Sequence, residues 1–199
     1  VRNLNRCYPG RPKGYLTERV AFGIMEIIRR EKVDLGVDLH ESAPEYPVIN
    51  AIVFHDGSAE LAALAQMSLQ SEGLEFRLEA SPQNLRGLSH REWGDAAGIK
   101  AVLIETPNPV QGRLKGRTTP ELVVEGKDKA YLKASRLGRL FVPYDEKGAP
   151  LGGRVARHLA AIGAVLEGLA ELEPEKAVAF EGFPDWRRVA AEGLGPFLR

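Results

Sequence analysis

Features that mark several specialised protein classes are scarce in this sequence. It has one cysteine, Cys7, which excludes an internal disulfide and any cysteine-rich zinc module. No apolar run approaches the roughly 20 residues that a membrane span requires. Neither sign of charge is in excess, since 27 Lys and Arg are balanced by 27 Asp and Glu. This balance argues against nucleic acid and against a membrane surface as partners, because both need a basic surplus.

What remains is the composition of an ordinary globular protein, with 44% hydrophobic and 27% charged residues. A chain of 199 residues can bury a core of useful size. No repeat or clear linker divides it, so we expect one domain over residues 1–199, with residues 110–199 as its C-terminal extension. A single cysteine suits the cytoplasm, and assembly as a homo-oligomer stays open.

Apolar residues recur with helical and strand periods that alternate along the chain. Residues 81–98 are polar and glycine-rich and are interpreted as a connector. Strands alternating with helices predict an α/β fold, a three-layer α/β/α sandwich around a mixed, mainly parallel sheet. The pattern predicts helices over 16–32, 58–72, 127–139 and 153–172, and strands over 34–40, 48–54, 74–78, 101–104 and 177–180.

Two ionisable residues follow apolar strands directly. His40 ends the first predicted strand, and Glu105 ends the apolar run 101–104. Ligands of open α/β sheets bind beyond the carboxyl ends of strands, where an imidazole can ligate a metal and a carboxylate can act as a general base. Asp38 shares the strand face of His40 and could orient a group there, or cap the strand end. A structural role is the alternative for His40 and Glu105 as well.

Two further segments carry side chains suited to anion recognition. Arg6 lies between amide-bearing neighbours that include Asn5, an arrangement that suits bidentate capture of a carboxylate or, alternatively, a simple turn. Arg86 and Arg91 lie in the predicted connector before the Glu105 strand. They could line an anionic-substrate pocket, or the segment could be a solvated connector.

Three short motifs in order resemble the zinc carboxypeptidase superfamily, and more closely its succinylglutamate desuccinylase/aspartoacylase-like branch. The segment 3–10 is similar to the Asp-x-Asn-Arg-x-Phe-Pro-Gly motif of that family, with Asn3 replacing the Asp. Residues 38–41 are similar to its Asp-Leu-His segment, and residues 104–106 to its late Glu-Thr. The resemblance covers roughly the first 110 residues.

The resemblance implies a zinc-dependent amide hydrolase that cleaves a small carboxylate-bearing N-acyl amino acid or peptide. Asn5 and Arg6 would hold the substrate, with Arg86 and Arg91 as further substrate-binding candidates. His40 would ligate one zinc ion. Glu105 would activate a zinc-bound water and pass its proton to the leaving amine.

The sequence differs from this family in its zinc-ligand motifs. The family takes its first two zinc ligands from a His-x-x-Glu motif upstream of the Asn-Arg motif, and this sequence has no such motif. The first strands of the family fold would also precede Val1. We therefore expect a C-terminal portion of a longer protein, with two further ligands upstream, weak zinc binding and no hydrolysis by this chain alone. The alternatives are a non-catalytic anion-binding domain and complementation by another chain.

Overall fold

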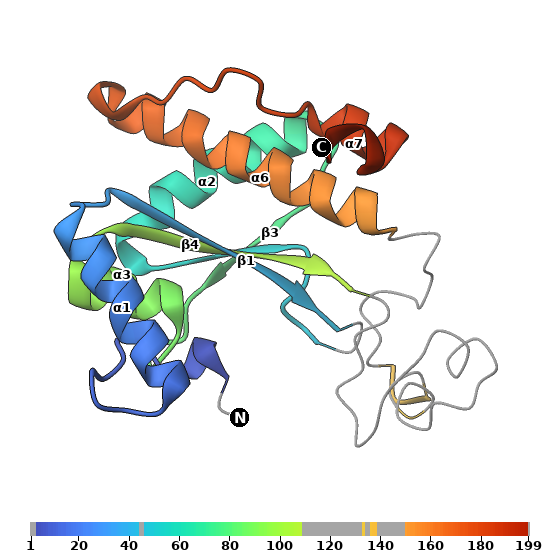
Figure 1. Cartoon of the computed structure of the whole chain (residues 1–199). Helices are drawn as coiled ribbons and strands as arrows, with labels where there is room; N and C mark the ends of the chain where they lie inside the picture. Colours follow the sequence, from blue (N-terminus) through green and yellow to red (C-terminus); the bar gives the residue numbers. More distant parts are fainter. Residues whose placement is uncertain (1–2, 44–45, 109–132, 134–135, 139–149, 199) are drawn as a thin grey trace.

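The computed structural model describes residues 3–43, 46–108, 133, 136–138 and 150–198 (Figure 1). None of the helices in these ranges is long and apolar enough to cross a lipid bilayer. The helices are α1 (Leu16–Arg30), α2 (Ala59–Ser71), α3 (Ser89–Ala97), α6 (Leu151–Leu172) and α7 (Trp186–Glu192), the strands are β1 (Leu35–Ser42), β2 (Ala51–Phe54), β3 (Arg77–Ala80) and β4 (Lys100–Pro107), and the short 3-10 helices are η1 (Leu4–Arg6), η2 (Asp56–Ser58), η3 (Pro174–Lys176) and η4 (Gly195–Phe197).

The four strands form one mixed sheet in the order β1-β4-β2-β3. β1 pairs with β4 in parallel, from Leu35 opposite Lys100 to Ser42 opposite Pro107. β2 pairs with β4 antiparallel and with β3 in parallel. The apolar run of β4 is therefore central, and it is buried on both faces, as expected for a strand enclosed by helices.

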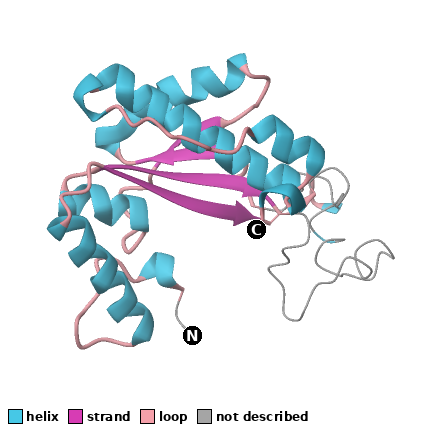
Figure 2. Ribbon diagram, turned by 45° about the horizontal axis from the view of Figure 1, so that its top comes forward, coloured by secondary structure: helices cyan, strands magenta, loops and turns pink. Residues whose placement is uncertain are grey.

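Helices cover both faces of the sheet (Figures 1 and 2). The first face carries α2 and α6, whose apolar side chains form a hydrophobic core with alternate residues of β2 and β4, among them Ile52, Val102 and Ile104. The opposite face carries α1 and α3, with a smaller core around Met25 and Trp93. This is the three-layer α/β/α arrangement with a mixed sheet that the sequence predicts.

The close approach of α6 to α2 follows from small residues. Most of the buried positions of α6 are Ala or Gly. A Cβ on Gly168 would lie 3.2 Å from Cδ1 of Leu61 on α2. The Leu61 side chain therefore packs almost directly against the backbone of α6 at this glycine. Small residues at such a contact let two helices pack closely, and burial of the surrounding alanine and leucine side chains stabilises the pair.

Most predicted elements are confirmed, and three differ. Residues 81–98 are not only a connector, because they contain α3 (Ser89–Ala97). The strand expected over 74–78 lies at Arg77–Ala80 instead. The strand expected over 177–180 is wrong: this segment has no strand pairing, and its Val178 and Phe180 are about half exposed. The helix expected over 127–139 falls largely outside the described residues.

Candidate active site at the ends of two parallel strands

The site begins with the register of β1 and β4. Because these strands are parallel neighbours, their carboxyl ends meet at one edge of the sheet. His40 is the register partner of Glu105, so both side chains point to the same face. Nδ1 of His40 lies 3.7 Å from Oε1 of Glu105. Two residues that the sequence singles out separately are thus brought together by one strand pairing.

The second nitrogen of the His40 ring contacts two other side chains. Nε2 lies 3.1 Å from Oδ2 of Asp38 and 3.4 Å from Nδ2 of Asn5. Burial acts to lower the pKa of His40, but the hydrogen bond and negative charge of Asp38, together with the charge of Glu105, outweigh it and raise this pKa. The imidazole is therefore oriented between two carboxylates.

Asp38 is held in turn by α3. The Ser89 hydroxyl, at the first residue of α3, donates a short hydrogen bond to Oδ2 of Asp38. Burial acts to raise the pKa of Asp38, yet the hydrogen bonds from His40 and Ser89 and the nearby imidazoles lower it overall. Asp38 stays ionised and fixes the ring of His40, the orienting role that was one of its two predicted options.

The Glu105 side chain is more buried than those of His40 and Asp38. Its side chain is largely buried, with the residue as a whole 8% exposed, and Oε2 accepts a 2.6 Å hydrogen bond from the hydroxyl of Ser42. Burial raises the pKa of Glu105, although the hydrogen bond from Ser42 and the charge of His40 act against that rise. A carboxylate whose pKa is raised toward neutrality is a better general base, because it holds an abstracted proton more readily.

The N-terminal motif reaches this site through η1. Oδ1 of Asn5 accepts a 2.6 Å hydrogen bond from the backbone N–H of Ser89, which fixes the amide beside His40. Gly87 makes this approach feasible: its φ is +84°, and a Cβ there would lie 2.6 Å from the carbonyl oxygen of Arg6. Arg6 itself is exposed and donates a hydrogen bond to the carbonyl oxygen of Asn5.

Four of the six predicted site residues line one cavity of about 220 Å³: Asn5, Arg6, His40 and Glu105. The hydroxyl of Ser42 lines it as well. These five residues come from η1 and from the ends of β1 and β4, so the fold gathers them from three separate segments of the chain.

The two other predicted residues are not brought to the cavity lining. Arg91 is buried on α3, where its guanidinium donates a 2.7 Å hydrogen bond to the carbonyl oxygen of Ser81 and lies 3.7 Å from Oδ1 of Asp95. Arg86 forms ion pairs with Asp95 and Glu92. Both cations are thus neutralised within the protein, which gives no geometric support to their predicted role in substrate binding.

Two serines that hold the site carboxylates, Ser42 and Ser89, are not among the residues predicted from the sequence. Ser42 lies two residues after His40 on the same face of β1, so strand alternation could have found it. Ser89 carried no such signal, because its role depends on α3, which the sequence did not predict.

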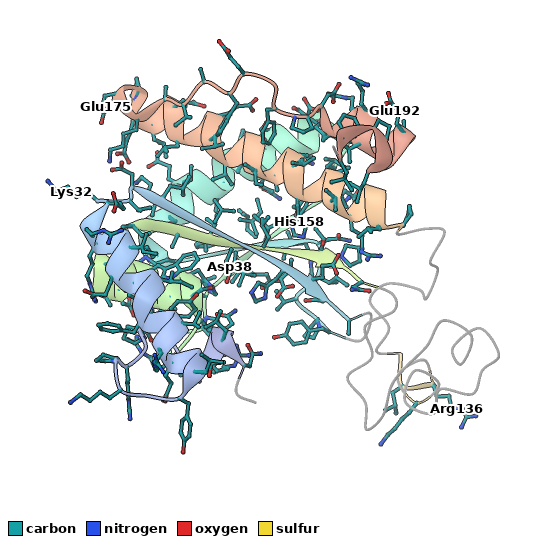
Figure 3. The ribbon with its side chains drawn as sticks, viewed as in Figure 1. Lys32, Asp38, Arg136, His158, Glu175 and Glu192 are labelled. Atoms are coloured by element: carbon teal, nitrogen blue, oxygen red, sulfur yellow. The ribbon has the colours of Figure 1, made fainter. Side chains whose placement is uncertain are left out.

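A second pair of polar residues lies on the opposite face of the sheet. Figure 3 shows Asp38 on the side away from α6 and His158 between the sheet and α6. Nε2 of His158 lies 3.0 Å from the hydroxyl of Thr106, and that hydroxyl also contacts the carbonyl oxygen of His40 at 3.5 Å. Burial lowers the pKa of His158, which favours its neutral form. This pair joins α6 to the end of β4 without entering the cavity.

The described residues do not form a zinc site by themselves. A catalytic zinc ion takes three protein ligands, normally His nitrogens or carboxylate oxygens. Within the described part of the chain, no three His, Cys, Asp or Glu side chains are grouped so that they could hold a metal ion. His40 is the predicted ligand, and both of its ring nitrogens lie near carboxylate oxygens of Asp38 and Glu105.

Comparison with known proteins adds one distant match. No family model matches the chain, and no curated protein does. A crystal structure of an aspartoacylase family protein from Mesorhizobium loti is 21% identical, with a TM-score of 0.40. The alignment covers 71% of this chain but only 41% of that protein, so the chain spans less than half the length of its structural match. A similarity of this size assigns neither activity nor ligand.

Proposed function

We propose that this chain contributes the general base and the carboxylate-binding side of an amide-hydrolase site, acting on a small N-acyl amino acid or peptide that bears a carboxylate. The observation that carries this proposal is the position of Glu105. Its buried carboxylate, with a raised pKa, lies beside the oriented His40 in the cavity that Arg6 also lines. A general base, an oriented imidazole and a cation for the substrate carboxylate are thus adjacent.

The proposed step is proton transfer by Glu105. The carboxylate removes a proton from a water molecule while the water oxygen bonds to the amide carbonyl carbon. The carbon–nitrogen bond then breaks, and the same proton passes from Glu105 to the leaving amine nitrogen. Arg6 would pair with the substrate carboxylate, and Asn5, whose amide is fixed by Ser89, would hydrogen-bond to the substrate.

We also propose that His40 is one ligand of a zinc ion whose remaining ligands lie outside the described residues. A metal-bound histidine usually donates the N–H of its other ring nitrogen to a carboxylate, and Asp38 contacts Nε2 of His40 in this way. Further ligands would come from a longer form of the protein or from another chain. A His-x-x-Glu following an apolar strand, encoded upstream of Val1, would support this.

The test is Glu105→Gln in the complete gene product that contains this chain, assayed by amine release from a panel of N-acyl amino acids. Loss of the base should lower kcat by about 10²–10⁴-fold, the usual range for general base catalysis, while bound zinc stays unchanged. Glu79→Gln, on β3 and outside the cavity lining, is the matched control and should keep full activity. Full activity of Glu105→Gln would remove Glu105 as the base.

A non-catalytic anion-binding domain is the second candidate. It is favoured by the lack of a metal-holding group among the residues that the structure describes. In that case a carboxylate ligand would bind the complete gene product and lose affinity in Arg6→Gln, with no amide hydrolysis at any zinc concentration.

A further inference from the structure

The lining of the cavity beside Glu105 combines polar and apolar side chains. The polar side chains, which we call the polar wall, come from η1 and its N-cap Asn3, from the ends of β1 and β4, and from Tyr46 and His90. The apolar side chains, which we call the apolar wall, come from the sheet, from the residues just before β2 and from the segment that precedes α3. This wall consists of Val48, Val53, Pro82, Leu85, Leu88 and Leu103.

Positive charge is confined to the polar wall. Among the described residues that line the cavity, Arg6 is the single Lys or Arg. His90 lines the cavity too, but its side chain is deeply buried and burial lowers its pKa to about 4, so the ring is neutral at physiological pH. Arg86 and Arg91 are not available, because they are paired with Asp95.

Negative charge is already present nearby. Glu105 lines the same cavity, and Asp38 contacts His40, whereas Glu41, which also lines it, is paired with Arg154. A ligand with one carboxylate can place it on Arg6. A second carboxylate on the same ligand would lie against leucine and valine side chains, where an unpaired charge is strongly disfavoured, or would face Glu105 and a His40 ring that is already paired with Asp38 and Glu105.

We infer that this cavity selects amides with a short, uncharged acyl group and one carboxylate, and discriminates against acyl groups that end in a second carboxylate. This inference rests on the proposed function and narrows its substrate class. A volume of about 220 Å³ is that of roughly seven water molecules, which suits a short acyl chain. An unpaired buried charge gives stronger discrimination than a missing apolar contact, because specificity follows the cost of the rejected ligand.

The experiment compares two probes that differ in one group. N-butyrylglycine and N-succinylglycine have the same chain length, but the terminal methyl of the first is a carboxylate in the second. Binding to the complete gene product is measured by calorimetry at pH 7, so no hydrolysis is required. N-butyrylglycine should bind at least about tenfold more tightly. Equal or tighter binding of N-succinylglycine would overturn the inference, as would binding of neither probe.

A charge-addition variant tests the apolar wall directly. Leu85 is 38% exposed, so Leu85→Arg can be accommodated without burying the new guanidinium. It should reverse the preference toward N-succinylglycine by supplying the missing cation. Met67→Arg adds the same charge on α2, at a residue 64% exposed and outside the cavity lining, and should leave the preference unchanged. An unchanged preference in Leu85→Arg would contradict the assignment of this wall.

The two proposals fail differently in these measurements. Selective binding of N-butyrylglycine without any amine release from it, in the zinc-loaded gene product, supports the selectivity and refutes the hydrolase function. Amine release that depends on Glu105 but favours N-succinylglycine supports the hydrolase function and refutes the selectivity.

Discussion

Ser42 and Glu105 lie on neighbouring parallel strands, and the Ser42 hydroxyl donates a 2.6 Å hydrogen bond to Oε2 of Glu105. Both residues are buried. The serine therefore supplies one of the few polar contacts available to a carboxylate that is otherwise surrounded by protein, and it also limits the rise in the pKa of Glu105.

Ser42→Ala should lower the free energy of unfolding by about 1–3 kcal/mol, because a buried carboxylate oxygen loses its donor. Ser68→Ala is the matched control: Ser68 also donates to a glutamate, at 3.0 Å, but that pair is exposed. The control should change stability by less than about 0.5 kcal/mol. Urea unfolding followed by circular dichroism measures both, and equal effects in the two variants would contradict the buried role of Ser42.

His90 should make the fold sensitive to mild acid. Its pKa is lowered to about 4 in the folded state by burial, against about 6.5 in an unfolded chain. Between these values the unfolded state binds more protons, so stability falls as the pH falls from 6.5 toward 4. Relative to His90→Gln, the wild-type chain should lose on the order of 2 kcal/mol more between pH 7 and pH 4.5. Parallel stability–pH curves for the two proteins would rule this out.

Gly36 should tolerate no side chain, because it faces α3 across the smaller core. A Cβ there would lie 2.6 Å from Cε3 of Trp93, so Gly36→Ala should destabilise the fold by about 1–3 kcal/mol through overpacking. Gly23, inside α1, has open space around its Cβ position. Gly23→Ala should be neutral or stabilise by up to about 1 kcal/mol, since alanine favours a helix. Thermal unfolding of both variants checks the pair, and the reverse order of stability would count against it.

Zinc should bind this chain weakly. The described residues place one predicted ligand, His40, in the cavity, and a single imidazole does not fix a metal ion. Equilibrium dialysis at pH 7.5 should give well under one tightly bound zinc per chain, and His40→Ala should change this little. A tight 1:1 stoichiometry would refute this prediction.

The strands and long helices could be predicted because their apolar residues follow a simple period. The run 101–104 became the buried centre of β4, and the helix expected over 153–172 was found at Leu151–Leu172. α3 could not be found in this way. Its first four residues, Ser89 to Glu92, are polar and yet buried, so no apolar stripe marks the helix. Only Gly98, the glycine that follows the last residue of α3, is a typical sign of a helix C-terminus in the sequence.

The candidate site was predicted to the extent that strand register determines it. His40 and Glu105 end their strands at paired positions, so their proximity follows from the sheet. The arginines of the connector were a different case. Arg86 and Arg91 have the charge that a carboxylate site needs, but their partner Asp95 lies on the unpredicted helix α3. Their neutralisation therefore could not be predicted without that helix.

The position of β4 determines when the cavity can exist during folding. β4 is the last described strand in sequence, yet it lies between β1 and β2, and β1 has no other described strand partner. Ser42 and Glu105 are 63 positions apart, so their contact is strongly non-local and forms slowly compared with helix contacts. A nascent chain that ends before Lys100 has β1 and the β2–β3 pair as separate pieces. β4 joins β1 to the β2–β3 pair and brings Leu103 and Glu105 into the cavity lining, so the described sheet and this lining are complete only when β4 is in place.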